Sequence, residues 1–218
     1  MTKTGEAARP QLDDSAESLM DWLQAHGRQV GIGAIVVAAI VAGSWVVTRS
    51  NATKAAGASR ALGDAQRSVA SGNLPLAAAD LQKLVQRYGS TPAGTQARLL
   101  LAQVSFQQGK VTEGLKILDE IGSAGALQAS VHALRAGGLE QSNKPAEAAA
   151  EYLKAAEAST LPTEKESYKT DAARAYQLAG KKDEALKIWQ AMADDQASPL
   201  NGEARLRVGE LGAAVATR

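Results

Sequence analysis

Hydrophobic residues form one uninterrupted run near the start of the chain and a periodic pattern after it. The run covers residues 29–48, which carry no charged side chain, and lies between Arg28 and Arg49. Twenty residues of α-helix extend about 30 Å, which is the thickness of the hydrocarbon core of a bilayer. Trp45 lies near the end of the run, where aromatic rings favour the membrane interface. The pattern predicts a single, uncleaved transmembrane helix at 29–48.

Two other interpretations of this run are a buried helix of a soluble core and a cleaved signal peptide. Small residues at 56–58 resemble a cleavage site, but the polar leader and the apolar run are both too long for a signal peptide. Four small residues of the run share one helical face, where they would let two membrane helices approach closely or would merely be tolerated: Gly31, Ala34, Ala38 and Ala42.

The segment before the run, residues 1–28, contains one short amphipathic pattern. A helix over 13–25 would place five apolar side chains on one side: Leu12, Ala16, Leu19, Met20 and Leu23. Such a helix could lie on a membrane surface or dock on a partner.

After the run, residues 49–218 repeat one helical pattern four times. Small residues occupy the same place in each copy, at positions 77, 114, 148 and 185. Their spacing is 37, 34 and 37 residues, against a period of about 34 for tetratricopeptide (TPR) repeats. A Gly or Asn precedes each small residue at the expected turn: Gly72, Gly109, Asn143 and Gly180.

The repeat frame predicts an all-α chain, in which a single transmembrane helix is followed by a TPR-like α-solenoid. The expected helix pairs cover residues 53–71/75–88, 92–108/112–123, 125–141/145–158 and 163–179/182–195. A last helix at 199–215 would cap the open end of the solenoid.

Charge and composition exclude several classes of function. The chain has 24 Lys and Arg against 23 Asp and Glu, a net charge of +1, so a nucleic-acid partner is not expected. It has no cysteine, which excludes disulfides and thiol chemistry, and only two histidines, His26 and His132. No GxxxxGK[ST], HExxH or GxSxG motif is present. We therefore expect no enzyme, no catalytic residue, no cofactor and no metal, with His132 packed or solvated.

A stack of helix pairs has a concave surface made mainly by the first helix of each pair. The frame places mostly amide side chains there, with few charges: Gln66, Gln103, Phe106, Gln107, Glu140, Gln141, Arg174 and Gln177. Among these, Gln103, Phe106, Gln107, Glu140, Arg174 and Gln177 are the candidate partner-binding residues. Phe106, the only Phe, is either an apolar anchor for a bound segment or part of the core between the helices.

The order of these parts resembles a known family. An N-terminal segment (LDDSAESLMDWLQAHGR), one apolar run ending near Trp45 and an Ala-rich array of degenerate TPRs are similar to the YfgM-like ancillary subunits of the SecYEG translocon. The resemblance implies an inner-membrane protein of Gram-negative bacteria with a cytoplasmic N-terminus and a periplasmic repeat domain. The partners it implies are SecYEG, a membrane-anchored periplasmic chaperone of the parvulin type, exported client proteins and membrane lipid.

Two competing hypotheses follow from the residues themselves. Four basic residues follow the apolar run closely: Arg49, Lys54, Arg60 and Arg67. The positive-inside rule then favours a cytoplasmic repeat domain, and hence a membrane-tethered adaptor for an unrelated complex. The other hypothesis is an enzyme of unrecognised type, which would require a pocket with convergent polar groups.

Overall fold

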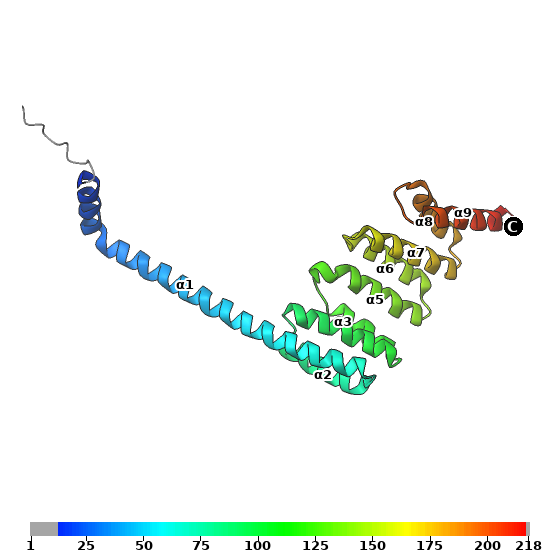
Figure 1. Cartoon of the computed structure of the whole chain (residues 1–218), viewed down its shortest axis with the longest axis horizontal. Helices are drawn as coiled ribbons and strands as arrows, with labels where there is room; N and C mark the ends of the chain where they lie inside the picture. The colour runs from blue at the N-terminus through cyan, green and yellow to red at the C-terminus, as the bar shows by residue number, and fades with distance from the viewer. Residues whose placement is uncertain (1–12, 217–218) are drawn as a thin grey trace, which may run out of the picture. The chain divides into compact units, whose positions relative to one another are not determined.

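A computed structural model of the chain describes the backbone of residues 13–216 and the side chains at 26, 28, 32 and 36–212. The chain consists of two units, of which the first ends at Thr53 and the second begins at Lys54. Regular structure over 13–216 is entirely helical (Figure 1). The expectation of an all-α fold is therefore confirmed for the described residues.

The first helix, α1 (Asp13–Ala70), is continuous where the sequence suggested three separate segments. No proline interrupts it, and hydroxyl groups that could compete with helical hydrogen bonds bond within the helix instead. Thr48 Oγ1 donates to the carbonyl of Trp45 at 2.9 Å, and Thr53 Oγ1 donates to that of Ser50 at 2.9 Å. Polar residues after the apolar run thus continue the helix and do not end it.

Among the described residues, no helix has both the length and the apolar character that crossing a membrane requires, in contrast to the transmembrane helix expected at 29–48. The expected span includes 29–31 and 33–35, whose side chains lie outside the described residues. Of the four small residues proposed for membrane-helix packing, Gly31 and Ala34 are in this group, while Ala38 and Ala42 are exposed. The apolar side chains between 12 and 23 also lie outside the described residues.

Helix pairs follow one another from the end of α1 onward, as the repeat frame predicts. The end of α1 pairs with α2 (Leu74–Tyr88), α3 (Pro92–Gln107) with α4 (Val111–Asp119), α5 (Gln128–Gln141) with α6 (Pro145–Ala158), and α7 (Pro162–Leu178) with α8 (Lys182–Asp194). The last helix, α9 (Asn201–Ala216), follows the fourth pair, where the sequence predicts a capping helix over 199–215. Figure 1 shows these pairs stacked in chain order.

The turns inside the four pairs share one backbone conformation. Gly72, Gly109 and Gly180 have φ of 76°, 76° and 74°, and Asn143 has φ of 58°. Gly adopts this left-handed conformation without a steric penalty, and Asn tolerates it better than most residues. The predicted turn positions are confirmed. Proline occupies the first turn of α2, α3, α6 and α7, where its missing N–H leaves no helical bond unmade.

The link between α4 and α5 differs from the expected one. Helix α4 ends at Asp119 and not near 123, and a short 3₁₀ helix, η1 (Gly125–Leu127), replaces the first turn expected for α5. Gly122 and Gly125 explain the difference, because Gly weakens a helix and Gly125 has φ of 55°.

The core consists of four apolar clusters along the array, each built where successive helices meet. The small residues of the repeat frame lie at these meeting points, since Ala77, Ala148 and Ala185 are 0% exposed and Gly114 is also buried. A short side chain at each place lets the helices of a pair approach closely.

Candidate partner-binding groove

The first helices of three successive pairs line a groove of about 500 Å³. We call it the groove throughout, and its lining residues are Leu62, Gln66, Gln96, Leu99, Leu100, Gln103, Leu127, Ser130 and Leu134. They come from the end of α1, from α3, and from η1 with the first half of α5. This is the inner surface that the repeat frame assigns to first helices.

The chemistry of the groove is apolar and amide, and none of its nine lining residues carries a charge. Five leucines offer apolar area. Gln66, Gln96 and Gln103 are exposed, and each amide can both donate and accept hydrogen bonds. The groove therefore suits an uncharged segment that brings apolar side chains and unpaired backbone groups.

The six candidate partner-binding residues do not form one site. Gln103 lines the groove, whereas Gln107 is exposed outside its lining. Further along the array, Glu140 accepts a hydrogen bond from the Tyr152 hydroxyl at 3.2 Å.

Arg174 forms an ion pair of 2.9 Å with Asp171, and Gln177 is half-buried. The candidate residues Glu140, Arg174 and Gln177 thus belong to a separate polar area on α5 to α7. Burial raises the pKa of Tyr152, and the charge of Glu140 acts in the same direction, so the phenol keeps its proton at neutral pH.

Phe106 is a core residue and not a surface anchor. Its side chain is 7% exposed and packs with Ala102, Leu118 and Val131. The ring needs this space because a β-carbon placed on Gly114 would lie 2.4 Å from Phe106 Cε1. Of the two interpretations of Phe106, the structure supports the core.

Sequence reasoning missed most of the groove. On α3 the lining residues fall at 96, 99, 100 and 103, which is the spacing of one helical face. This spacing is visible in the sequence and could have identified these four residues as one surface. No signal in the sequence places Leu127 and Ser130 in the groove, because their positions depend on the η1 turn, which the sequence did not predict.

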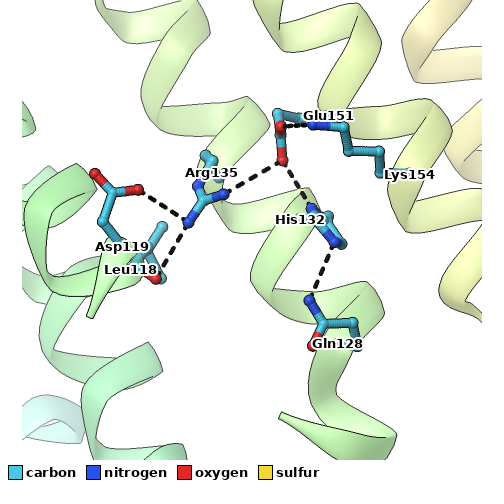
Figure 2. A network of polar contacts seen from close by, with 7 residues as sticks. All are labelled: Leu118, Asp119, Gln128, His132, Arg135, Glu151 and Lys154. Atoms are coloured by element: carbon cyan, nitrogen blue, oxygen red, sulfur yellow. Dashed lines mark hydrogen bonds and ion pairs between the residues drawn. The ribbon is translucent and has the colours of Figure 1, made fainter. Parts of the chain in front are cut away.

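A network of polar side chains holds α5 and α6 together beside the groove (Figure 2). His132 Nδ1 lies 2.7 Å from Glu151 Oε2, and Gln128 Nε2 lies 3.1 Å from His132 Nε2. Lys154 Nζ donates to Glu151 Oε1 at 2.6 Å. His132 is therefore a bonded member of a network, consistent with the expectation of a packed histidine.

Arg135 extends the network to the end of α4. It lies 3.0 Å from the Asp119 carboxylate and 3.8 Å from that of Glu151, and it donates to the carbonyl of Leu118 at 3.2 Å. Burial alone raises the pKa of Glu151, but bonds from Lys154 and His132 and the charge of Arg135 lower it on balance. The carboxylate stays ionised in a mostly buried place.

The described residues offer little catalytic chemistry. They contain no group of three His, Asp or Glu side chains placed to hold a metal ion. The charges around His132 pair with one another. The groove is the candidate functional site, because its lining combines apolar side chains with exposed amide groups.

Comparison with solved structures supports the fold. The chain is similar to the nearly identical TPR-like repeats attributed to a kinesin light chain of Podosopora anserina, with a TM-score of 0.56 and 18% identity over 73% of this chain and 87% of that one. A variant of the same repeats gives a TM-score of 0.55, 18% identity, and coverage of 73% and 86%. At this identity the likeness concerns the fold alone.

Comparison of sequences gives the family. No curated protein matched the chain. The family model for the tetratricopeptide repeat-like domain matches residues 20–207, which is most of the chain and includes all the lining residues of the groove. The chain belongs to the tetratricopeptide repeat-like domain family.

Proposed function

We propose that the chain is a non-catalytic scaffold that holds an uncharged, apolar segment of a protein partner in the groove. TPR-like folds serve as protein-interaction scaffolds, and their stacked helix pairs offer extended concave surfaces. The observation that carries the proposal is a lining of five leucines and three glutamines without a charge. A charged partner residue would lose its hydration there and gain no opposite charge.

Photo-crosslinking tests this binding site. A photoreactive phenylalanine analogue at Gln103, in the full chain in cells, is expected to capture protein partners. The matched control carries the same analogue at Gln82, an exposed residue of α2 outside the groove. Equal capture from both positions would contradict the proposed site.

Ser130→Glu adds a second test because it places a charge in the groove at an exposed residue. Capture at Gln103 should fall about tenfold, since an uncompensated charge costs roughly 1–3 kcal/mol in a partly desolvated site. Gln82→Glu should leave it unchanged.

For the partner, we propose the SecYEG translocon, with a membrane-anchored periplasmic chaperone of the parvulin type and exported proteins as clients. The support is the order of parts along the sequence, which resembles the YfgM-like translocon subunits. The proposed mechanism has no covalent step. The N-terminal part recruits the protein to the channel, and the groove holds an apolar segment of an emerging chain or of the chaperone.

The proposed location is the bacterial inner membrane, with residues 1–28 in the cytoplasm and the repeats in the periplasm. Support comes from the charge-free run at 29–48 and from eight large apolar side chains of α1 that are half exposed or more: Ile32, Val36, Val37, Ile40, Val41, Trp45, Val46 and Val47. Apolar side chains of this size favour an apolar environment over water.

Labelling of a single cysteine tests the location, since the chain has none of its own. Ser90→Cys lies in the turn after α2. In cells with a permeabilised outer membrane, a membrane-impermeant maleimide should label it, and co-purification with SecYEG should follow. Labelling only after lysis of the inner membrane would contradict the periplasmic location.

The second candidate function is a membrane-tethered adaptor whose repeats face the cytoplasm. The observation that favours it is the excess of basic residues after the apolar run, at Arg49, Lys54, Arg60 and Arg67. Protection of Ser90→Cys until lysis is the outcome that selects this function.

A further inference from the structure

The hydrogen bonds around Gln128 determine which way its amide points. The backbone N–H of Ala124 donates to Gln128 Oε1 at 3.2 Å. The amide nitrogen therefore faces the ring of His132, at 3.1 Å from Nε2. An amide nitrogen can only donate, so Nε2 of His132 must be an unprotonated acceptor.

The other ring nitrogen of His132 carries the proton. Nδ1 lies 2.7 Å from Glu151 Oε2, and an ionised carboxylate can only accept. Bonds at both ring nitrogens are satisfied together only by a neutral imidazole with its proton on Nδ1. Figure 2 shows the ring between these two partners.

A second proton on His132 conflicts with the contact to Gln128. Two donors would then face each other between the ring and the amide nitrogen. Rotating the amide by half a turn does not keep both bonds, because its nitrogen would then face the donor N–H of Ala124. Protonation must break one of the two bonds that Gln128 makes.

The charges around the ring direct the change toward Gln128. Glu151 on α6 attracts a protonated ring, so the contact at Nδ1 is kept. Arg135 on α5 and Lys154 on α6 repel it, and both pair with Glu151. Asp119 at the end of α4 pairs with Arg135. The ring stays bound to Glu151, and the Gln128 amide turns so that its oxygen accepts a hydrogen bond from the protonated Nε2, because a bond from a charged donor is the stronger one. The bond from the N–H of Ala124 to the amide oxygen is therefore the one that is lost.

The yielding bond holds one wall of the groove. Gln128 joins η1 to α5. Its side-chain bond to the N–H of Ala124 holds the turn that carries Leu127, together with the backbone bond from the N–H of Leu127 to the carbonyl of Ala124 at 3.0 Å. Leu127, Ser130 and Leu134 line the groove on this side. We infer that His132 is a proton-linked switch, which keeps the η1 wall of the groove ordered when neutral and releases it when protonated. The binding consequence rests on the proposed function of the groove.

Nuclear magnetic resonance of the full chain in detergent micelles tests the switch without any ligand. Histidine titrates between about pH 5 and 8, so the imidazole of His132 and the amide proton of Ala124 are followed over that range. The two signals should change with one midpoint. An Ala124 signal that stays constant while His132 titrates would overturn the inference.

Three variants separate the titration of His132 from its effect on the amide of Ala124. In Gln128→Ala, His132 should still titrate but Ala124 should no longer follow. In His132→Asn, the response of Ala124 should disappear, whereas His26→Asn, the matched control for the other histidine, should keep it. A pH response of Ala124 that survives in His132→Asn would also overturn the inference.

Binding is measured with a blocked, tetramethylrhodamine-labelled peptide of Leu, Ala, Ser and Gln as the probe. Its affinity should fall about fivefold on the acidic side of the His132 midpoint, the loss expected for one hydrogen bond. The affinity for Gln128→Ala should not depend on pH. A pH-independent affinity of the native chain would contradict the link to binding. A probe that binds at no pH would refute the proposed function of the groove, and the Ala124 titration would still decide the switch.

Discussion

At the scale of single residues, close packing around one aromatic ring decides which glycines are replaceable. Gly138 on α5 faces Phe106, and a β-carbon there would lie 2.6 Å from Phe106 Cζ and 2.9 Å from Leu115 Cδ2. The neighbouring Gly137 has open space at the same place. The two glycines are adjacent in sequence but differ completely in what a methyl group would contact.

Gly138→Ala should therefore destabilise the protein by about 1–3 kcal/mol, because an extra methyl group overpacks the core. Gly137→Ala is the matched control in the same helix and should stabilise it by about 0.5–1 kcal/mol, since Ala favours helix. Urea unfolding followed by circular dichroism measures both. A neutral Gly138→Ala would show that Phe106 is not packed as described, and a destabilising Gly137→Ala would show that the space beside Gly137 is not open.

The ionised Glu151 makes stability depend on pH at one position. Its bonds with Lys154 and His132 outweigh burial and hold its pKa below the ordinary value of 4.5. A carboxyl group with a lowered folded-state pKa contributes stability above its ordinary pKa, and this stability is lost as pH falls through the lowered value.

Glu151→Gln should consequently cost about 1–3 kcal/mol at neutral pH, the cost of removing one partner from a buried charged hydrogen bond. The difference from the native chain should narrow as the pH falls below 4.5. Glu157→Gln, at an exposed position of the same helix, should change stability by less than about 0.5 kcal/mol. Urea midpoints between neutral and acidic pH provide the measurement, and a cost independent of pH would contradict an ionised Glu151.

At the scale of elements, one left-handed residue ends the first helix of each pair. Gly180 has φ of 74°, and no atom lies within 4 Å of the place that a β-carbon would occupy, so only the backbone conformation opposes a side chain there. Asn143 occupies the equivalent turn of the preceding pair.

Gly180→Ala should thus cost about 1–2 kcal/mol, the penalty for a side chain in left-handed geometry. Gly180→Asn should cost less than half as much, because Asn is tolerated at the equivalent turn. Both are measured as shifts of the urea midpoint at constant slope. Equal free-energy costs for Gly180→Ala and Gly180→Asn would show that the left-handed backbone conformation is not what opposes a side chain at this position.

Helix pairing was predictable from the sequence because it depends on short-range signals. Prolines, turn residues and the small residues at 77, 114, 148 and 185 all act within one pair, and the helix ends follow them. The groove and the His132 network depend on how one pair rotates against the next, which no local signal specifies. Phe106 illustrates the limit, since a difference in helix rotation separates a surface position from the core.

At the scale of the whole repeat unit, stability is distributed along the array. Each apolar cluster joins only neighbouring helices, with Leu81 in the cluster of α1 to α3 and Trp189 in that of α7 to α9. Both side chains are 0% exposed. In an array with contacts between neighbours, damage at one end should loosen that end first.

Trp189→Ala should remove about 3–5 kcal/mol from its cluster, the usual loss for a buried aromatic residue. Hydrogen exchange with mass spectrometry should then show faster exchange in α7 to α9, while α2 and α3 keep their protection. Leu81→Ala should give the opposite distribution, with faster exchange in α2 and α3 and little change in α8 and α9. Faster exchange along the entire array in both variants would mean that the repeats unfold as one cooperative unit. The groove spans the first three pairs, so only Leu81→Ala should also weaken capture of partners at Gln103.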